Sequence, residues 1–448
     1  MAPDRLRTIC MAVSAEARDN GRPSSWSAEL DALASGADSP DEIKRLIVLA
    51  AGNTAPGEWS TYPDSNLTSS VHNPGQSWNA LTVGACTNKA IISNSDLSGY
   101  TPLATPGDMS PFNTTSLTWE ERKWPVKPDI VLEGGNAAKD ASGFCTVCDD
   151  LSLLTTGHEP TTRIFESFSM TSHAAAQAAW MAAQIHDAYP QAWPETVRGL
   201  LVHSASWTDA MLRRWPGANK GDKAKLLRCC GYGVPILQNA IECARSRFTI
   251  ISQQIMQPYE KPKGCSAPRT KDMHLFKLPW PKDGLLALGG LDAQLKITLS
   301  YFIEPSPGEV GWKSRYRYPS HTLRFALQSV NETEEEFKRR VNVAAREDGE
   351  EKPKTKGEPE RWVLGEHARD FGSIHSDTWE GSAAELATCN MVAVYPIGGW
   401  WKERRHLGKW NRQTRYSLII SVLTDQTAVD IYTPVAAQIH VPIVVNVQ

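Results

Sequence analysis

The chain has 448 residues, of which 41% are apolar and 22% charged, and its net charge is −3. At roughly 150 residues per domain, this length predicts two or three domains. The composition is that of an ordinary globular protein and excludes collagen-like, coiled-coil and largely disordered chains. A net charge near zero also argues against a dedicated nucleic-acid-binding protein, which usually carries a strong basic excess.

Membrane, export and cofactor signals are weak throughout the chain. The continuous apolar runs, such as residues 46–51, are far shorter than the roughly 20 residues that a membrane span needs, so no membrane segment is expected. The first 13 residues hold no apolar core followed by a cleavage site, which predicts a cytoplasmic protein with reduced cysteines. Cys145 and Cys148 form a CxxC pair without a second pair at zinc spacing, so we expect idle thiols and neither metal nor cofactor.

The first 53 residues predict a strand, a helix and a second strand. Residues 8–13 are apolar and strand-like, residues 19–25 form a polar turn, and residues 26–34 have helical spacing. Residues 46–51 are a continuous apolar run, which is typical of a strand buried on both faces of a parallel sheet. This order therefore predicts a βαβ unit and an α/β core.

The next 150 residues continue the α/β pattern less regularly. Residues 80–85 predict a short strand, and a long stretch rich in loops follows it to about residue 165. Within that stretch, residues 126–132 form an extended segment that enters a Gly-Gly-Asn turn. Residues 172–189 predict an Ala-rich helix, and residues 194–205 predict a second helix with proline in its first turn.

The sequence pattern changes at about residue 258, where β-rich segments replace the βαβ pattern. We therefore divide the chain into an incomplete α/β domain at 1–257 and a β-sandwich-like domain at 258–448. The predicted strands of the second domain are residues 295–302, 322–328, 391–395, 416–423 and 443–447.

Two features of the second domain favour structural interpretations. Residues 332–361 are dominated by Glu, Lys and Arg, which predicts a charged insertion formed by a solvated helix and a mobile loop. Trp400 and Trp401 stand beside several basic residues, where they would form either a partner-binding surface or part of the packed sandwich. We expect packing.

Ser172 begins the Ala-rich helix, within the run Thr171-Ser172-His173. A serine at a helix N-terminus can cap the helix by accepting a hydrogen bond from an orphan N–H group. It can also be a nucleophile, because the helix-end N–H groups and dipole stabilise a developing oxyanion. On this stretch alone, the cap is the simpler interpretation.

Asn53 follows the buried strand of residues 46–51, in the run Ala51-Gly52-Asn53. Open α/β sheets place their sites at the carboxyl ends of parallel strands. An asparagine there can donate an amide N–H to an oxyanion. The alternative is an ordinary turn, since Asn and Gly favour turns.

These motifs occur in one chain and in an order that resembles the subtilisin-like serine peptidases. Residues 1–250 are similar to the C-terminal two thirds of their peptidase domain, and the β-rich region resembles a domain appended in an intracellular bacterial branch. The segments that carry the resemblance are Ala51-Gly52-Asn53, residues 78–85, Lys127-Pro128-Asp129, Thr171-Ser172 and residues 189–205.

The resemblance implies a serine endopeptidase that acts on protein or peptide substrates. Ser172 would be the acylated nucleophile, and Asn53 together with the Ser172 backbone N–H would form the oxyanion hole. Residues 9–25 would pair with an extended substrate by strand addition.

The sequence departs from the family pattern at three places near the serine. Met170 stands where the family usually has glycine, and His173 stands where a small residue is common. Residues 133–136, Glu-Gly-Gly-Asn, replace the usual small-residue turn.

The family also has an aspartate and a histidine before the serine, and their motifs are missing from this sequence. Asp19-Asn20-Gly21 lies in a polar turn, and the first histidine, His72, comes after Asn53. A serine hydroxyl needs an oriented base to take its proton. An oxyanion hole alone leaves a residual rate of roughly 10³–10⁴ over water.

Other histidines are poor substitutes for the missing base. His173 is adjacent to Ser172, and neighbouring side chains on a helix do not face each other. His203 is expected to be packed within the second helix. His375 and Asp377 share a face of a predicted strand, where a surface hydrogen bond explains the pair.

Three hypotheses remain open. The chain is an N-terminally truncated serine peptidase, a non-catalytic peptide- or partner-binding module, or one half of a split peptidase. In the third case a partner chain supplies the aspartate and histidine.

Overall fold

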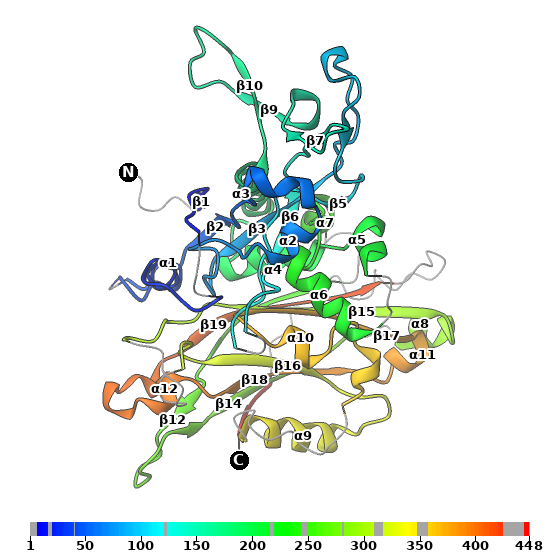
Figure 1. Ribbon diagram of the computed structural model, residues 1–448. Helices are drawn as coiled ribbons and strands as arrows, with labels where there is room; N and C mark the ends of the chain where they lie inside the picture. Colours follow the sequence, from blue (N-terminus) through cyan, green and yellow to red (C-terminus); the bar gives the residue numbers. More distant parts are fainter. Residues whose placement is uncertain are drawn as a thin grey trace. The chain divides into compact units, whose positions relative to one another are not determined.

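The computed structural model describes residues 7–16, 20–39, 41–120, 123–215, 219–242, 249–279, 282–308, 317–346, 357–423 and 443–447. The chain forms two compact units, Met1–Ala240 and Ile241–Gln448 (Figure 1). The second unit includes β11 (Thr249–Met256), which pairs along its length with β19 (Thr414–Leu423). The division at 240 therefore falls one strand before the boundary at 257 that the sequence suggests.

The first unit is built on a parallel sheet, as the sequence predicts. Its strands are β1 (Thr8–Met11), β2 (Leu46–Ala50), β3 (Leu81–Thr87) and β6 (Ile130–Glu133), which pair in parallel in that order. The short β5 (Asp108–Met109) pairs antiparallel with the end of β3. All five residues of β2 are buried, which explains why the strand is a continuous apolar run.

Three helices frame this sheet. α1 (Ser25–Ser35) begins at a capping box formed by Ser24 and Ser27 and ends at Gly36, whose φ of 73° is left-handed. α3 (Met170–Ala188) packs against β1, β2, β3 and β6, and α4 (Pro194–Ser204) packs against α3. The α3 face that meets the sheet carries small side chains, which permits a close approach; they are Ala174, Ala175, Ala178 and Ala182.

The smaller elements of the first unit lie mainly in the loop-rich region. They include a three-stranded sheet of β4 (Thr101–Pro102), β7 (Ala138–Lys139) and β8 (Cys145–Thr146), and a ribbon of β9 (Leu153–Thr156) and β10 (Phe165–Phe168). The remaining elements are η1 (Pro56–Thr61), α2 (Asp64–Thr68), η2 (Ser95–Leu97), η3 (Asp149–Leu151), α5 (Asp209–Arg214), α6 (Lys220–Cys230) and α7 (Leu237–Glu242).

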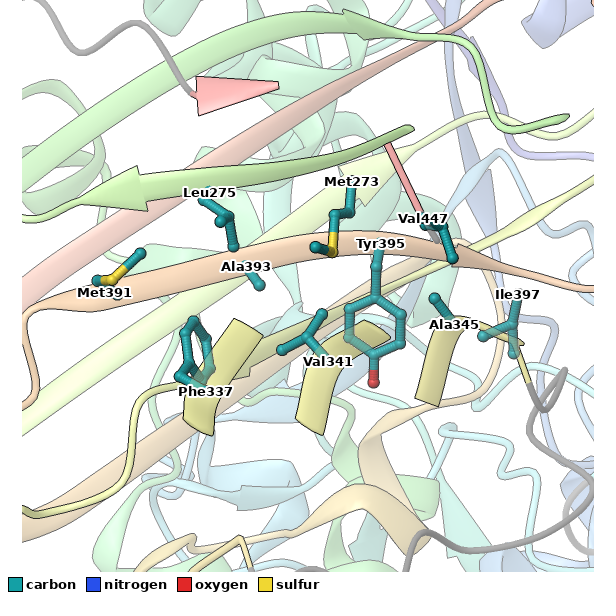
Figure 2. Close-up of a cluster of buried hydrophobic side chains, with 10 residues drawn as sticks. All are labelled: Met273, Leu275, Phe337, Val341, Ala345, Met391, Ala393, Tyr395, Ile397 and Val447. Atoms are coloured by element: carbon teal, nitrogen blue, oxygen red, sulfur yellow. The ribbon is translucent and has the colours of Figure 1, made fainter. Parts of the chain in front are cut away.

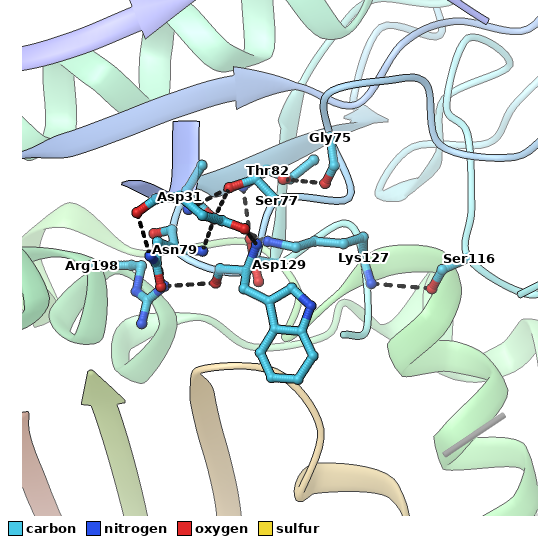
Figure 3. A network of polar contacts seen from close by, with 11 residues as sticks. Asp31, Gly75, Ser77, Asn79, Thr82, Ser116, Lys127, Asp129 and Arg198 are labelled. Atoms are coloured by element: carbon cyan, nitrogen blue, oxygen red, sulfur yellow. Dashed lines mark hydrogen bonds and ion pairs between the residues drawn. The ribbon is translucent and has the colours of Figure 1, made fainter. Parts of the chain in front are cut away.

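The Lys-Pro-Asp segment lies at the amino ends of β3 and β6, where it forms a buried ion pair (Figure 3). Lys127 Nζ lies 2.6 Å from Asp129 Oδ2 and donates to the Ala80 carbonyl at 2.9 Å. The Thr82 N–H donates to the same aspartate at 2.7 Å. Burial lowers the pKa of Lys127, and Asp129 opposes that shift. The segment thus joins two strands at the end opposite Asn53.

A second buried carboxylate ties α1 to the start of β3. Asp31 accepts hydrogen bonds from the Ser77 hydroxyl and from the backbone N–H groups of Trp78 and Asn79, at 2.5, 3.1 and 2.8 Å (Figure 3). Arg198 of α4 donates to the carbonyls of the same two residues at 3.1 and 2.8 Å. These contacts hold α1 and α4 on the sheet and leave its carboxyl edge for the candidate site.

The second unit contains two four-stranded antiparallel sheets, in the orders β11-β19-β15-β17 and β16-β18-β14-β20. A hydrogen bond of 2.6 Å between His274 Nδ1 on β14 and the Tyr416 hydroxyl on β19 joins the two sheets, so their inner faces meet. The β-rich second domain is therefore confirmed. Its further strands are β14 (Asp272–Lys277), β15 (Asp292–Tyr301), β16 (Thr322–Leu327), β17 (Ile374–Ser382), β18 (Met391–Ile397) and β20 (Ile443–Asn446).

α9 (Glu334–Arg346) covers the outer face of the second sheet (Figure 2). Phe337, Val341 and Ala345 recur every fourth residue and pack against β14 and β18. The helix in the charged insertion is confirmed, but the expectation of a solvated helix is wrong for this face. The expected loop lies largely outside the described residues. The other elements of the unit are β12 (Tyr259–Glu260), β13 (Arg269–Thr270), α8 (Lys282–Leu288), η5 (Pro359–Arg361), α10 (Glu366–Arg369), α11 (Ala383–Leu386), α12 (Trp400–Glu403), η6 (Arg405–Leu407) and η7 (Lys409–Asn411).

The tryptophan pair of the second unit is packed, as expected. Trp400 and Trp401 are buried in a cluster with Tyr259. Both indole N–H groups donate to Glu304, one to its carbonyl at 3.1 Å and the other to its carboxylate at 2.9 Å. These contacts account for both side chains without a partner-binding role.

The expected surface hydrogen bond between His375 and Asp377 is wrong, because both residues are buried in β17. Asp377 accepts from the N–H groups of Leu364 and Gly365 at 2.9 and 2.8 Å. His375 Nε2 lies 3.2 Å from the Gly372 carbonyl. The two side chains hold neighbouring loops in place.

None of the helices in the described parts of the chain has both the length and the hydrophobicity required to cross a membrane.

Candidate active site

Asn53 lies at the carboxyl edge of the parallel sheet, directly after the turn that ends β2. Gly52 has a φ of 92°, and a Cβ on it would lie 2.2 Å from Cγ of His72. Only glycine fits this turn, because a side chain would be strained and would overlap the imidazole. The Ala51 carbonyl accepts from the His72 N–H at 2.8 Å and from the Thr114 hydroxyl at 3.0 Å, which fixes the turn.

Ser172 is the third residue of α3. The N-cap of the helix is Ser169, whose hydroxyl donates to Ser152 Oγ at 2.9 Å and makes no capping bond. The interpretation of Ser172 as the cap is therefore wrong. The first four N–H groups of a helix have no acceptor within it, and the Ser172 N–H is one of them.

The structure brings the Asn53 side chain against the residue that precedes Ser172. The Thr171 N–H donates to Asn53 Oδ1 at 3.0 Å, and the Thr171 hydroxyl lies 2.9 Å from the same oxygen. A backbone N–H can only donate, so the atom that faces α3 is the amide oxygen. The amide nitrogen must then point away from Thr171. Within the described ranges, no protein group accepts a hydrogen bond from it.

Residues 133–136, which differ from the family pattern, contact the first turn of α3. The Gly134 carbonyl accepts from the Met170 N–H at 2.6 Å, and a Cβ on Gly134 would lie 2.5 Å from the Ala85 Cβ. Gln177 of α3 donates to the Glu133 carbonyl at 2.7 Å. The first turn of α3 is therefore held from the end of β6 as well as from the end of β2.

Met170 adopts the backbone conformation that its usual glycine would favour. Its φ is 76°, which costs an L-residue with a Cβ about 1–2 kcal/mol. Its side chain packs against the cluster of Trp59, Phe112 and Ala137. The site therefore keeps the left-handed backbone, and the side chain contributes contacts that offset the strain.

No described residue hydrogen-bonds to the Ser172 hydroxyl. His173 Nδ1 lies 2.8 Å from Gln177 Nε2, so its ring faces the next turn of α3, as its position next to the serine predicts. His72 packs beneath Gly52. Burial lowers the pKa of both imidazoles, and the charge of Glu16 opposes the shift at His72.

β1 is the edge strand of the parallel sheet, and no described strand pairs with its outer edge. The chain beyond it returns to the site, since Ala15 and Asn73 exchange two backbone hydrogen bonds of 2.8 Å each. This free edge is part of the segment 9–25 for which the resemblance implies strand addition by a substrate. Residues 17–19 of that segment lie outside the described residues.

The cysteines form no metal site in the described parts of the chain. No group of three or more His, Cys, Asp or Glu side chains there could hold a metal ion. Cys145 and Cys148 are half-buried free thiols whose pKa values are raised by burial. Cys229 and Cys230 are buried at the end of α6.

Sequence reasoning misses the contact that orients Asn53. Thr171 is part of the nucleophile motif, but its bond to Asn53 spans 118 positions and has no local signal. The close contact of His72 with Gly52 is also missed. The one sequence feature that indicates these contacts is Gly52, which stands between the buried strand β2 and Asn53.

The chain matches the family model described as "Subtilase family" over residues 1–233. It is 26% identical over 313 residues to an uncharacterized Sinorhizobium fredii protein, y4bN, and the match covers 66% of each chain, just under two thirds. Among solved structures it is similar to a protease from Pseudoalteromonas arctica, with 17% identity and a TM-score of 0.31 over 52% of this chain and 50% of that one.

A second similar structure is MycP1 from the ESX-1 type VII secretion system. The identity is 18% and the TM-score 0.23, over 44% of this chain and 42% of that one. TM-scores this low add nothing to the description of the fold. The family match spans more than half of the chain and includes both Asn53 and Ser172. The chain belongs to the subtilase family.

Proposed function

We propose that this chain is the nucleophile-bearing part of a subtilisin-type serine endopeptidase that hydrolyses peptide bonds in protein or peptide substrates. One observation carries the proposal: Thr171 holds Asn53 by its amide oxygen, so that the amide nitrogen is directed elsewhere. This orientation is the one an oxyanion-hole donor requires. A turn asparagine without a catalytic role has no need of it.

In the proposed reaction, Ser172 Oγ attacks the scissile carbonyl carbon. The Asn53 amide and the Ser172 N–H stabilise the negative charge that develops on the carbonyl oxygen. The C–N bond then breaks, and the amine leaves with the proton that a base has taken from the serine. Water hydrolyses the resulting ester, which releases the acid and restores Ser172.

The base and its orienting carboxylate have no candidate among the described residues near Ser172. We therefore propose that an aspartate and a histidine outside this chain's described site complete the triad. Without them, oxyanion stabilisation leaves only a residual rate of roughly 10³–10⁴ over water.

Labelling with a fluorophosphonate probe tests the nucleophile. The serine oxygen forms a bond to phosphorus, fluoride leaves, and the hydroxyl proton goes to the base or, where the base is missing, to water. We expect slow labelling of the wild-type chain, at the residual rate that the oxyanion hole allows, and Ser172→Ala should abolish it. Ser169→Ala is the matched control, because it removes a neighbouring hydroxyl of the same helix end, and it should keep the label. A folded chain that takes up no probe would contradict an activated Ser172 in this chain.

A split peptidase is a second candidate, and the free edge of β1 favours it. A parallel edge strand in an α/β sheet is normally covered or paired, because it offers unsatisfied N–H and carbonyl groups. In this proposal a partner chain adds a strand to β1 and brings the aspartate and histidine. Probe labelling that appears only when such a partner co-purifies would support it. Equal labelling of the isolated chain would contradict it.

A non-catalytic peptide- or partner-binding module is the remaining alternative. Binding alone needs no oriented amide, so the Asn53–Thr171 contact counts against it. We also propose a cytoplasmic location. All eight described cysteines are free thiols, which is typical of a reducing compartment.

A further inference from the structure

Two buried threonines flank Asn53, one from α3 and one from the chain that follows it. Thr171 is fully buried, and its hydroxyl lies 3.1 Å from the Gly52 carbonyl oxygen as well as in contact with the Asn53 amide. Thr54 is also buried, and its hydroxyl donates to the Pro111 carbonyl at 2.6 Å. Both side chains are held by hydrogen bonds, so neither leaves room for a substrate side chain on its side of Asn53.

His72 lies against the turn before Asn53 and, unlike the two threonines, is partly exposed. A Cβ on Gly52 would lie 2.2 Å from Cγ and 2.5 Å from Nδ1 of His72, so the imidazole fills the volume directly beside this glycine. The His72 N–H donates to the Ala51 carbonyl at 2.8 Å, and the His72 carbonyl accepts from the Gly75 N–H at 2.7 Å. These two bonds hold the backbone that carries the ring against the turn.

The chain that follows β1 borders the same surface. Ala15 and Asn73 exchange two backbone hydrogen bonds of 2.8 Å each, which brings the largely exposed segment 12–16 next to His72. The charge of Glu16 acts on the imidazole, as expected for a neighbouring residue. An exposed segment of chain, a glycine turn and an imidazole therefore meet beside the proposed oxyanion hole.

Covalent geometry directs one substrate side chain to this surface. The substrate residue that supplies the scissile carbonyl, here called the acyl residue, has its Cβ within about 4 Å of the carbonyl oxygen. In the proposed reaction that oxygen is held by Asn53 and the Ser172 N–H, so the side chain of the acyl residue begins next to Asn53. Because the two threonines close their sides, it extends toward Gly52 and His72.

From these contacts we infer that His72 determines substrate specificity by restricting the acyl residue to a small side chain, such as that of glycine, alanine or serine. The imidazole fills the volume that a long or aromatic side chain would need, and overpacking such a contact is unfavourable. Burial lowers the pKa of His72, which favours the uncharged ring at neutral pH, so the selection is by size. This inference rests on the proposed peptidase function, since it concerns the same substrate carbonyl.

A binding comparison on the full chain tests the inference without requiring catalysis. Two fluorescein-labelled hexapeptides share their first five residues and end in either alanine or phenylalanine, so that the terminal carboxylate takes the place of the scissile carbonyl. By fluorescence anisotropy, we expect the Ser172→Ala chain to bind the peptide ending in alanine about tenfold more tightly, as steric exclusion at a binding site allows. Adding His72→Ala should remove or reverse this preference, because it frees the volume beside Gly52.

The matched control is His158→Ala, which removes an imidazole that is 80% exposed elsewhere in the same unit and should keep the preference. Modification by diethyl pyrocarbonate is a second readout that needs no substitution at His72. In the Ser172→Ala chain, the peptide ending in alanine should slow modification of His72 and leave that of His158 unchanged, as measured by peptide mapping.

An unchanged preference in the His72→Ala chain, or no protection of His72 by the peptide, would overturn the inference. Failure of probe labelling at Ser172 would contradict the peptidase proposal alone, because the binding comparison uses a chain without that hydroxyl.

Discussion

Replacing Met170 by glycine and by alanine tests whether the residue before the Thr171-Ser172 pair is held in a left-handed conformation. Both substitutions remove the side chain that packs against Trp59 and Phe112, so their difference isolates the backbone. A residue with a Cβ at a φ of 76° is strained by about 1–2 kcal/mol, whereas glycine is not. Glycine loses about 0.5–1 kcal/mol more conformational entropy on folding.

The expected result is that Met170→Gly is more stable than Met170→Ala by about 0.5–1 kcal/mol. Ala176 is the matched control, because it is exposed on the same helix. There the change to glycine should cost about 1 kcal/mol, with the opposite sign. Glycine and alanine should thus exchange rank between two positions six residues apart on one helix.

Hydrogen exchange of α3 peptides across a urea series measures the unfolding free energy of the first unit separately from the second. If Met170→Ala equals or exceeds Met170→Gly in stability, the left-handed backbone at this position is refuted.

Three further predictions concern the site and the second unit. Thr171→Val keeps the backbone bond to Asn53 but removes the hydroxyl, so the rate of probe labelling should fall by about fivefold, as loss of one hydrogen bond of about 1 kcal/mol allows. An unchanged rate would show that the hydroxyl does not orient the amide. Gly52→Ala should destabilise the first unit by about 2 kcal/mol or more in urea, because the new Cβ meets His72, and wild-type stability would contradict the turn. Burial lowers the pKa of His274 to about 4, so the unfolded chain takes up its proton first as the pH falls, and stability of the second unit should decline between about pH 6.5 and pH 4. Burial also lowers the pKa of His375 in the same unit to about 4, so His274→Gln should reduce the decline without removing it in urea titrations at both pH values. An equally steep decline would assign it to other groups.

The elements that the sequence predicts well are those with a strong local signal. The run at 46–51 is apolar at every position because β2 is buried on both faces. The helices at 172–189 and 194–205 have helical spacing and, in the second, a proline in the first turn. These patterns are set by residues close together in the sequence, so the strand and the helices can be predicted without the tertiary fold.

The elements that the sequence does not predict depend on distant contacts. The ribbon of β9 and β10 lies in a stretch for which the sequence predicts loops. Its apolar residues face solvent, so apolar and polar residues do not alternate along it as they would in a strand with one buried face. The charge of α9 predicts a solvated helix, although Phe337 and Val341 stand one helical turn apart. Which face of a charged helix is buried depends on the sheet beneath it.

The candidate site also has one part that the sequence predicts and one part that depends on distant contacts. Ser172 and Asn53 can be selected from motifs, and their catalytic roles stay predictions. The bond by which Thr171 turns the Asn53 amide cannot be derived, since it requires the sheet, the turn at Gly52 and the docked helix together.

That bond also determines when the site can exist during synthesis of the chain. Its two ends are 118 positions apart, so Asn53 emerges from the ribosome long before Thr171. Contacts of such high sequence separation form late, after the loop between them has closed. A nascent or partly folded chain therefore carries the serine without the oriented amide. The candidate site of the first unit is therefore assembled only after the turn at Gly52 and the first turn of α3 have docked.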